Sequence, residues 1–207
     1  MKRMILIALL ALALPMVAFA SNSVDFTNSG GNLTGSSAGL TLTGSELIAV
    51  NGFMGGSLMT GDLGTVSFST GAFTGSLQMG GTFSGTGSTF DIVGGSGSGL
   101  PSNLFSGSFT CSATSPCSWT LVTLANGTHN YTLTGTIQGT WYDGTTVSGA
   151  TVQLTINTGK GYFNGRTTIS SGDTNITTLS TPEPGTLALL GTGLVGIAGT
   201  LRRKLKA

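Results

Sequence analysis

The chain has 207 residues, enough for one modest domain with terminal segments. Only 7% of its residues are charged, against roughly 25% in an ordinary soluble domain, and Gly, Ser and Thr replace the missing charges. Over residues 21–180, two cations stand against six carboxylates, a net charge of −4. No basic stripe is present to neutralise phosphates, so we expect no binding to nucleic acid.

The first twenty residues have the three parts of a secretory signal peptide. Two basic residues precede an apolar run from residue 4 to residue 14, and Ala18-Phe19-Ala20 closes the segment with small residues at the positions that signal peptidase reads. We expect cleavage after Ala20 and export of the remaining chain. The alternative is an apolar anchor that is retained.

Residues 21–180 are predicted to form one β-rich domain, because they show short alternating runs broken by Gly, Asn and Ser and no sustained helical period. The first part repeats a Gly-apolar-Thr/Ser pattern without a fixed period. Its Phe and Ile residues favour an ordered structure over a flexible, coat-like segment. The stretch 94–103, GGSGSGLPSN, is expected to be a loop between two halves of this domain. A linker between domains is the alternative, although neither half alone is long enough for a secure core.

The clearest strands lie in the second part of the domain. In "NYTLTGTIQGTWYDG", apolar side chains fall on one face and threonines on the other, and "ATVQLTIN" alternates in the same way before the turn "NTGKG". Short turns favour antiparallel pairing of sequence neighbours. The sequence therefore predicts an all-β, Gly/Thr/Ser-rich fold, either an antiparallel β-sandwich or a partly closed barrel.

Two cysteines, Cys111 and Cys117, bracket a short Ser- and Pro-containing loop. In an exported protein such a close pair is most simply a disulfide. A metal site would need further ligands, and a redox dithiol would favour the tighter C-x-x-C spacing. We therefore predict a Cys111–Cys117 disulfide and no metal site.

Signals for catalysis or a cofactor are weak. The G-x-G-x-x-G match at residues 191–196 has neither a preceding strand nor a following acidic residue, as a dinucleotide site would require. The body's carboxylates are spread singly, whereas a secreted hydrolase would need two of them within about 5–10 Å in a cleft. The single histidine, His129, follows a predicted turn and is expected to be an exposed loop residue. We expect no enzymatic activity and no cofactor.

The aromatic side chains of the body could line a sugar-binding platform; these are Trp119, Tyr131, Trp141, Tyr142 and Tyr162. The strand alternation places Tyr131 and Trp141 in the core, and Tyr142 on the opposite face is the first candidate for ligand contact. Exposed coplanar rings would support a carbohydrate-binding protein, and buried rings a structural one.

Residues 181–207 form a separate terminal segment. Pro182-Glu183-Pro184 interrupts regular structure, an uncharged stretch from Leu187 to Leu201 follows, and the chain ends in basic residues. Counted from Gly185, the 17 residues would span roughly 25 Å as a helix, and the basic side chains can extend that reach toward the ~30 Å of a membrane core. We predict a C-terminal transmembrane helix, with the cytoplasmic stop at its end and the body across the membrane; the stop residues are Arg202, Arg203 and Lys204.

This order of motif, apolar span and basic end resembles the PEP-CTERM sorting signal of Gram-negative bacteria. The resemblance implies recognition by an exosortase, a membrane-embedded, cysteine transpeptidase-like enzyme that cuts near the motif and releases or transfers the body to the cell surface. Pro182, Glu183 and Pro184 would be the recognition motif, with Thr181 where Val is common. Members of this family often accompany exopolysaccharide production and biofilm or floc formation.

The sequence thus favours an exported, non-enzymatic protein of the cell surface or of a biofilm matrix. It would first be anchored in the inner membrane with its body in the periplasm, and would then reach the surface or the medium. The expected partners are signal peptidase, the exosortase and extracellular polysaccharide. The runner-up is a carbohydrate-binding module or adhesin, and the third class is a secreted hydrolase.

Overall fold

The computed structural model describes residues 22–112, 114 and 116–178. Residues 23–177 form one compact unit. The predicted signal peptide with Ala18 and Ala20, the sorting motif Pro182-Glu183-Pro184, the predicted transmembrane helix and the basic stop all lie outside the described residues.

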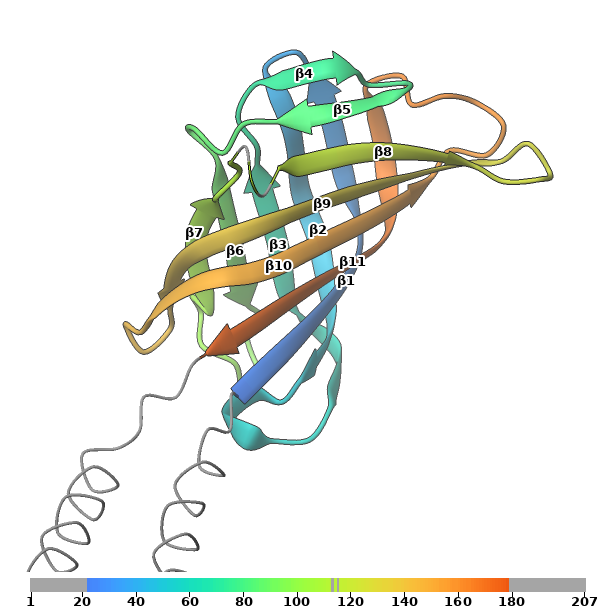
Figure 1. Ribbon diagram of the computed structural model, residues 1–207. Helices are drawn as coiled ribbons and strands as arrows, with labels where there is room; N and C mark the ends of the chain where they lie inside the picture. The colour runs from blue at the N-terminus through green and yellow to red at the C-terminus, as the bar shows by residue number, and fades with distance from the viewer. Residues whose placement is uncertain (1–21, 113, 115, 179–207) are drawn as a thin grey trace, which may run out of the picture. The chain divides into compact units, whose positions relative to one another are not determined.

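The described chain consists almost wholly of β-strands joined by turns and loops (Figure 1). A single turn of 3-10 helix, η2 (Phe53–Gly55), interrupts them, and within this part of the chain no helix has the length and apolar character needed to cross a membrane. The strands are β1 (Asn22–Ser36), β2 (Gly39–Asn51), β3 (Met59–Ser69), β4 (Phe73–Ser76), β5 (Gly80–Phe83), β6 (Thr89–Gly94), β7 (Phe105–Phe109), β8 (Cys117–Thr123), β9 (His129–Trp141), β10 (Thr146–Asn157) and β11 (Arg166–Thr178).

Eight of these strands form a closed barrel. The strands follow one another in the order β10-β11-β1-β2-β3-β6-β7-β9. The ring closes because β9, the last of them, pairs with β10, the first, along the whole length of β10, from Thr140↔Thr146 to Asn130↔Asn157. The pairing of β1 with β11 joins the two ends of the domain. Closure leaves no unpaired edge in the ring, which is the usual benefit of a barrel over an open sheet.

The remaining strands form a branch at one end of the barrel. The first half of β9 pairs with β8 and its second half with β7, so these two strands share one edge of β9. From β8 the sheet continues through β5 to β4, and the backbone N–H of Phe73 reaches the Ser37 carbonyl at the β1–β2 turn. Within the branch, the Trp119 indole N–H of β8 donates to the Leu77 carbonyl oxygen of the β4–β5 turn at 2.9 Å.

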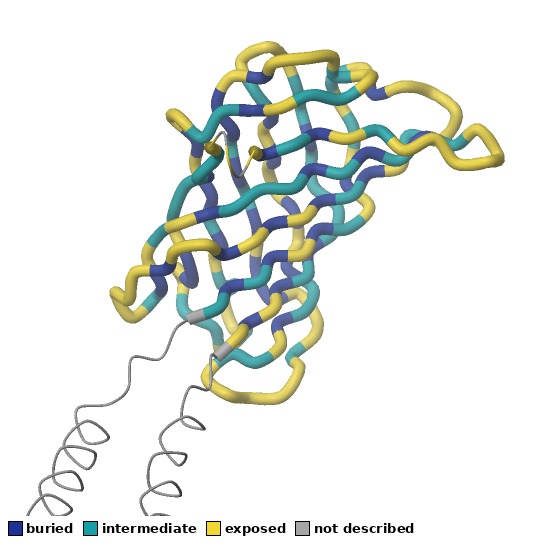
Figure 2. Tube along the Cα trace, in the orientation of Figure 1, coloured by how far each residue is buried: buried dark blue, intermediate teal, exposed yellow. Residues whose placement is uncertain are grey.

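The barrel interior is a packed core of aliphatic and aromatic side chains, and exposed residues alternate with buried ones along the strands (Figure 2). Large rings of one strand lie over glycines of its hydrogen-bonded neighbour. A Cβ added at Gly139 would lie 2.7 Å from Cζ of Phe105, and one at Gly135 would lie 2.9 Å from Cδ1 of Phe109. These two glycines continue the inward face of β9 between larger residues and make room for rings that β7 supplies.

The all-β prediction is confirmed, and the pairs of strands with a defined register are antiparallel. Of the two predicted architectures the barrel is the nearer one, and the structure corrects the prediction in one respect: the ring is fully closed rather than partly closed. The first half of the chain contributes strands of 15, 13 and 11 residues to it, much longer than its sequence pattern suggests. The stretch 94–103 joins the adjacent strands β6 and β7, as expected for a loop within one domain.

Candidate functional site

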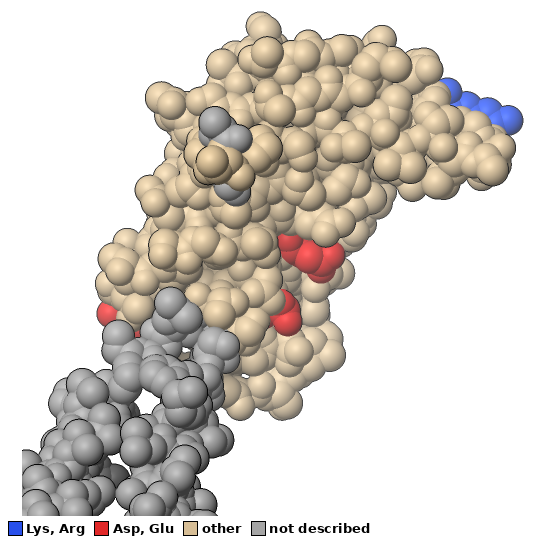
Figure 3. Space-filling model, in the orientation of Figure 1, with Lys and Arg blue, Asp and Glu red and all other residues tan. Residues whose placement is uncertain are grey.

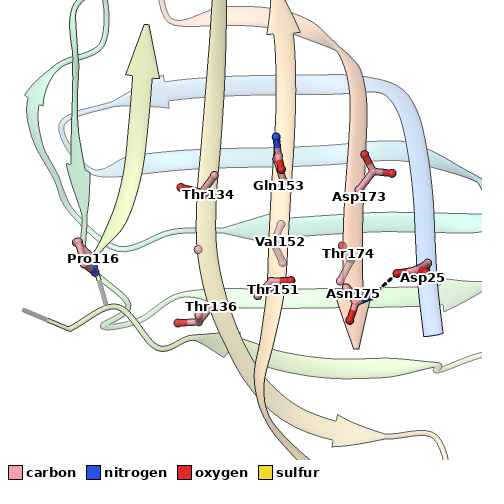
Figure 4. A pocket seen from close by; sticks show the side chains of 11 residues that line it. Asp25, Pro116, Thr134, Thr136, Thr151, Val152, Gln153, Asp173, Thr174 and Asn175 are labelled. Carbon is pink, nitrogen blue, oxygen red and sulfur yellow. Dashed lines mark hydrogen bonds between the residues drawn. The ribbon is translucent and has the colours of Figure 1, made fainter. Parts of the chain in front are cut away.

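An open polar hollow of about 590 Å³ lies on the outer face of the barrel, across β9, β10, β11 and β1 (Figure 4). It is built from two rows of side chains that cross the strands. One row is Thr134, Gln153 and Asp173, which the register aligns on β9, β10 and β11. The second row, in the same strand order with β1 added, consists of Thr136, Thr151, Asn175 and Asp25.

The flanks of the hollow are fixed by hydrogen bonds. The Thr27 hydroxyl donates to Oδ1 of Asp173 at 3.1 Å, and the Asn175 amide donates to Asp25 and, at 2.9 Å, to the Ser23 hydroxyl. On the opposite flank, the hydroxyls of Thr134 and Thr136 are hydrogen-bonded to those of Ser118 and Thr110, at 2.7 and 3.0 Å. The side chains on both flanks are therefore held in place before any ligand arrives.

The centre of the hollow differs from its flanks. Within the described residues, the side chains of Gln153 and Thr151 on β10 have no hydrogen-bond partner, and both are exposed. Neighbouring strands lie ≈ 4.8 Å apart and alternate residues of one strand ≈ 7 Å apart, so these groups form a grid of donors and acceptors on a scale similar to that of sugar hydroxyls. The arrangement can bind an uncharged polyol through hydrogen bonds.

Charge is sparse on this face. Figure 3 shows acidic side chains in small separate patches on a largely uncharged surface, and basic side chains on the projecting tip. Asp25 and Asp173, which are far apart in the sequence, are brought into the same hollow by the β1–β11 pairing. Among the described residues, no group of three or more His, Cys, Asp or Glu side chains could hold a metal ion. Elsewhere, in the β9–β10 turn, the hydroxyl and backbone N–H of Thr145 lower the pKa of Asp143.

The predicted disulfide borders this site. The sulfur atoms of Cys111 and Cys117 lie 2.01 Å apart and the Cα atoms 5.1 Å apart, which confirms the pairing. Cys117 is fully buried, and a Cβ at Gly135 would lie 3.0 Å from its sulfur. The bridge ties the Pro116 end of its loop to the hollow, because Gly135 and Pro116 both line it.

Tyr131 and Trp141 lie in the core, as the strand alternation predicted, and are 0% and 7% exposed. Trp119 is also buried and stacks on Tyr131 with ring centroids 5.1 Å apart. Tyr142, the first candidate for ligand contact, is half-buried and packs against Phe53 and Trp141. These four rings do not form an exposed platform.

Tyr162 is the exposed ring of this set, at 48%. It lies in the loop between β10 and β11 and stacks on His129, with ring centroids 4.2 Å apart. The prediction of an exposed loop His129 was wrong: this residue begins β9, is 7% exposed, and has Nδ1 3.2 Å from the Gly161 carbonyl oxygen. The loop of residues 158–165 covers the histidine, and the local turn signal around Asn126 and Gly127 could not reveal that.

Fold and hollow together define a small barrel protein that presents rows of hydrogen-bonding groups, most of them uncharged, on its outside. A comparison with family models then identifies the tail: residues 180–204 match the PEP-CTERM protein-sorting motif. Comparisons with curated proteins and with solved structures gave no match. The chain therefore carries a PEP-CTERM sorting signal, as its sequence predicted, and this signal implies export, membrane anchoring before processing, and processing by an exosortase.

Proposed function

We propose that this protein is a non-enzymatic component of the bacterial cell surface or extracellular matrix, released there from the membrane by an exosortase. The observation that carries the proposal is the sorting motif at residues 180–204 on a chain whose body is a closed, disulfide-bridged barrel. Such a body suits the cell exterior, because the disulfide persists in an oxidising environment and closure of the ring removes sheet edges that could pair with other chains.

The proposed route has three steps. Signal peptidase removes residues 1–20, and the body crosses to the periplasm while the tail stays in the inner membrane with Arg202, Arg203 and Lys204 on the cytoplasmic side. The exosortase then binds Pro182-Glu183-Pro184 as an extended peptide, which the two prolines favour by fixing φ and removing backbone donors. Cleavage near the motif releases or transfers the barrel.

The outer face of the barrel suits a hydrated polymer. Its hollow offers Gln153 and Thr151 as free hydrogen-bonding groups between flanks that are already ordered, so the side-chain entropy lost when a polyol binds there is confined to these two residues. This arrangement favours extracellular polysaccharide as the partner. It also supports the second candidate function, a carbohydrate-binding module or adhesin, with hydrogen bonds rather than an aromatic platform as the means of contact.

Intact mass of the protein from membrane and medium fractions, in cells with and without the exosortase, tests the route. We expect loss of residues 1–20 and of residues beyond about Pro184 only when the enzyme is present. An uncut tail in both strains would make the protein a membrane-anchored periplasmic protein and would refute the matrix proposal.

Co-sedimentation of the protein with exopolysaccharide from the same cells tests the partner. A Gln153→Ala/Thr151→Val double variant should bind several-fold more weakly, whereas Gln138→Ala, an exposed glutamine of β9 outside the hollow, should bind as the unaltered protein does. Equal binding by all three proteins would exclude the hollow as the contact site.

A further inference from the structure

The loop between β2 and β3 presents an apolar tip to solvent. Residues 51–59 read NGFMGGSLM and contain no ionisable side chain. Met54 is 74% exposed and Leu58 is 61% exposed, although both are large and apolar. Neither side chain contributes to the barrel core, so both are free to make a contact outside it.

The tip has a defined shape. The Phe53 ring anchors it against Trp141 and Tyr142, with centroids 6.1 and 5.3 Å away, and the N–H of Gly55 and Gly56 bond to carbonyls within the turn. Met54 adopts φ 53° and ψ 29°, the left-handed region that residues with a Cβ seldom occupy. A glycine would fit this position with less strain, so folding of the loop does not explain the methionine.

The loop lies at the end of the barrel where the domain begins and finishes (Figure 1). Asn51 pairs with Asp25 near the start of β1, and Gly52 approaches the Ser23 carbonyl so closely that no Cβ would fit. The Asn175 side chain near the end of β11 donates to Ser23 as well. The apolar tip and the two ends of the domain therefore share one end of the barrel.

The sequence limits how far this end can be from the membrane while the tail is uncut. Eight residues lie between Thr178 and Leu187, where the uncharged stretch begins, and even fully extended the nine Cα-to-Cα steps span only about 30 Å. A tether this short holds the tip at a high effective concentration near the lipid surface.

We propose that the 51–59 loop rests on the lipid surface of the membrane that holds the tail, with Met54 and Leu58 in its interfacial layer. This inference rests on the proposed anchoring of the uncut protein. An uncharged apolar tip on a rigid support gains free energy by leaving water at such an interface. The contact ends when the tail is cut, so the same loop does not hold the released barrel at the membrane.

Methionine oxidation tests the contact in the full chain, because a second exposed methionine, Met79, serves as an internal reference. Met79, in the β4–β5 turn, is 66% exposed, and that branch reaches the β1–β2 turn at the opposite end of β1. The chain with its tail is inserted into vesicles of phosphatidylethanolamine and phosphatidylglycerol, and flotation verifies anchoring. Chloramine-T, an anionic oxidant that stays in water, is then added, and sulfoxide formation at both residues is followed by peptide mass spectrometry.

We expect Met54 to oxidise several-fold more slowly than Met79 in floated vesicles. Leu58→Asp should bring the Met54 rate close to that of Met79, because a carboxylate opposes entry into the interface, whereas Val122→Asp on the β8–β9 hairpin should leave Met54 protected. Equal rates in floated, unaltered protein would overturn the lipid contact while leaving the anchoring intact. Protection that persists in Leu58→Asp, or that rises with protein density in the membrane, would overturn it in favour of a second copy of the chain. Failure to float would overturn the anchoring and, with it, this inference.

Discussion

The Tyr131 hydroxyl connects three parts of the chain that are distant in sequence. It donates to the Gln78 carbonyl oxygen at 2.9 Å and accepts from the backbone N–H of Phe163 at 3.1 Å, while its ring is fully buried against Trp119. Tyr131→Phe keeps the ring and removes both bonds. The substitution therefore measures how much this one oxygen atom contributes to holding the β4–β5 turn against the barrel.

The expected cost follows from the two groups left behind. The N–H of Phe163 lies in a buried bond and would lose its partner without access to water, at about 1–3 kcal/mol. Gln78 is exposed, so its carbonyl can turn to water at a net loss of about 0.5–1.5 kcal/mol. We expect the free energy of unfolding to fall by about 1.5–4.5 kcal/mol, the sum of the two costs.

Equilibrium unfolding in urea, followed by the fluorescence of the buried Trp119 and Trp141, measures this loss as a lower midpoint at unchanged slope. Tyr142→Phe is the matched control, because this half-buried tyrosine shows no hydroxyl hydrogen bond within the described part of the chain; its change should stay within about 0.5 kcal/mol. If Tyr131→Phe unfolds at the same midpoint as the control, the hydroxyl does not join the turn to the barrel and the reasoning fails.

Three further predictions concern the tail, the bridge and one strand. Glu183→Gln should leave membrane insertion intact and block processing, so the measured intact mass should still include the tail. Normal maturation of this variant would show that Glu183 is not part of the recognition motif. Replacing Cys111 and Cys117 with Ser should lower the free energy of unfolding by about 2–3 kcal/mol, since the bridge closes a short loop, and an unchanged denaturation midpoint would contradict this. Gly31→Ala should destabilise the protein more than Gly30→Ala. Both glycines have φ near +70 to +80°, but only at Gly31 would a Cβ meet backbone, 2.6 Å from the Ser45 nitrogen; equal thermal midpoints would argue against that clash.

The position of the hollow could not be derived from the sequence, although each of its strands could. The alternation of β9 and β10 indicates that Thr134, Thr151 and Gln153 face outward. Which residues stand beside them depends on the register, and on the pairing of β1 with β11 across about 150 residues. Asp25 and Asp173 therefore looked like isolated charges in the sequence. The loop of residues 51–59 is similar, because only the fold reveals that its apolar tip lies at the end where the domain begins and finishes.

The sequence by itself determined the sorting signal, the all-β class, the disulfide and the inward face of β9, because each depends on residues that are close together in the chain. Tertiary structure alone decided that the sheet closes, that Tyr142 is half-buried while Tyr162 is exposed, and that His129 is covered by residues 158–165. Those outcomes depend on which distant segments meet. In a chain of short, similar Gly- and Thr-rich runs, local pattern does not choose between partners, and the packing of the whole core does.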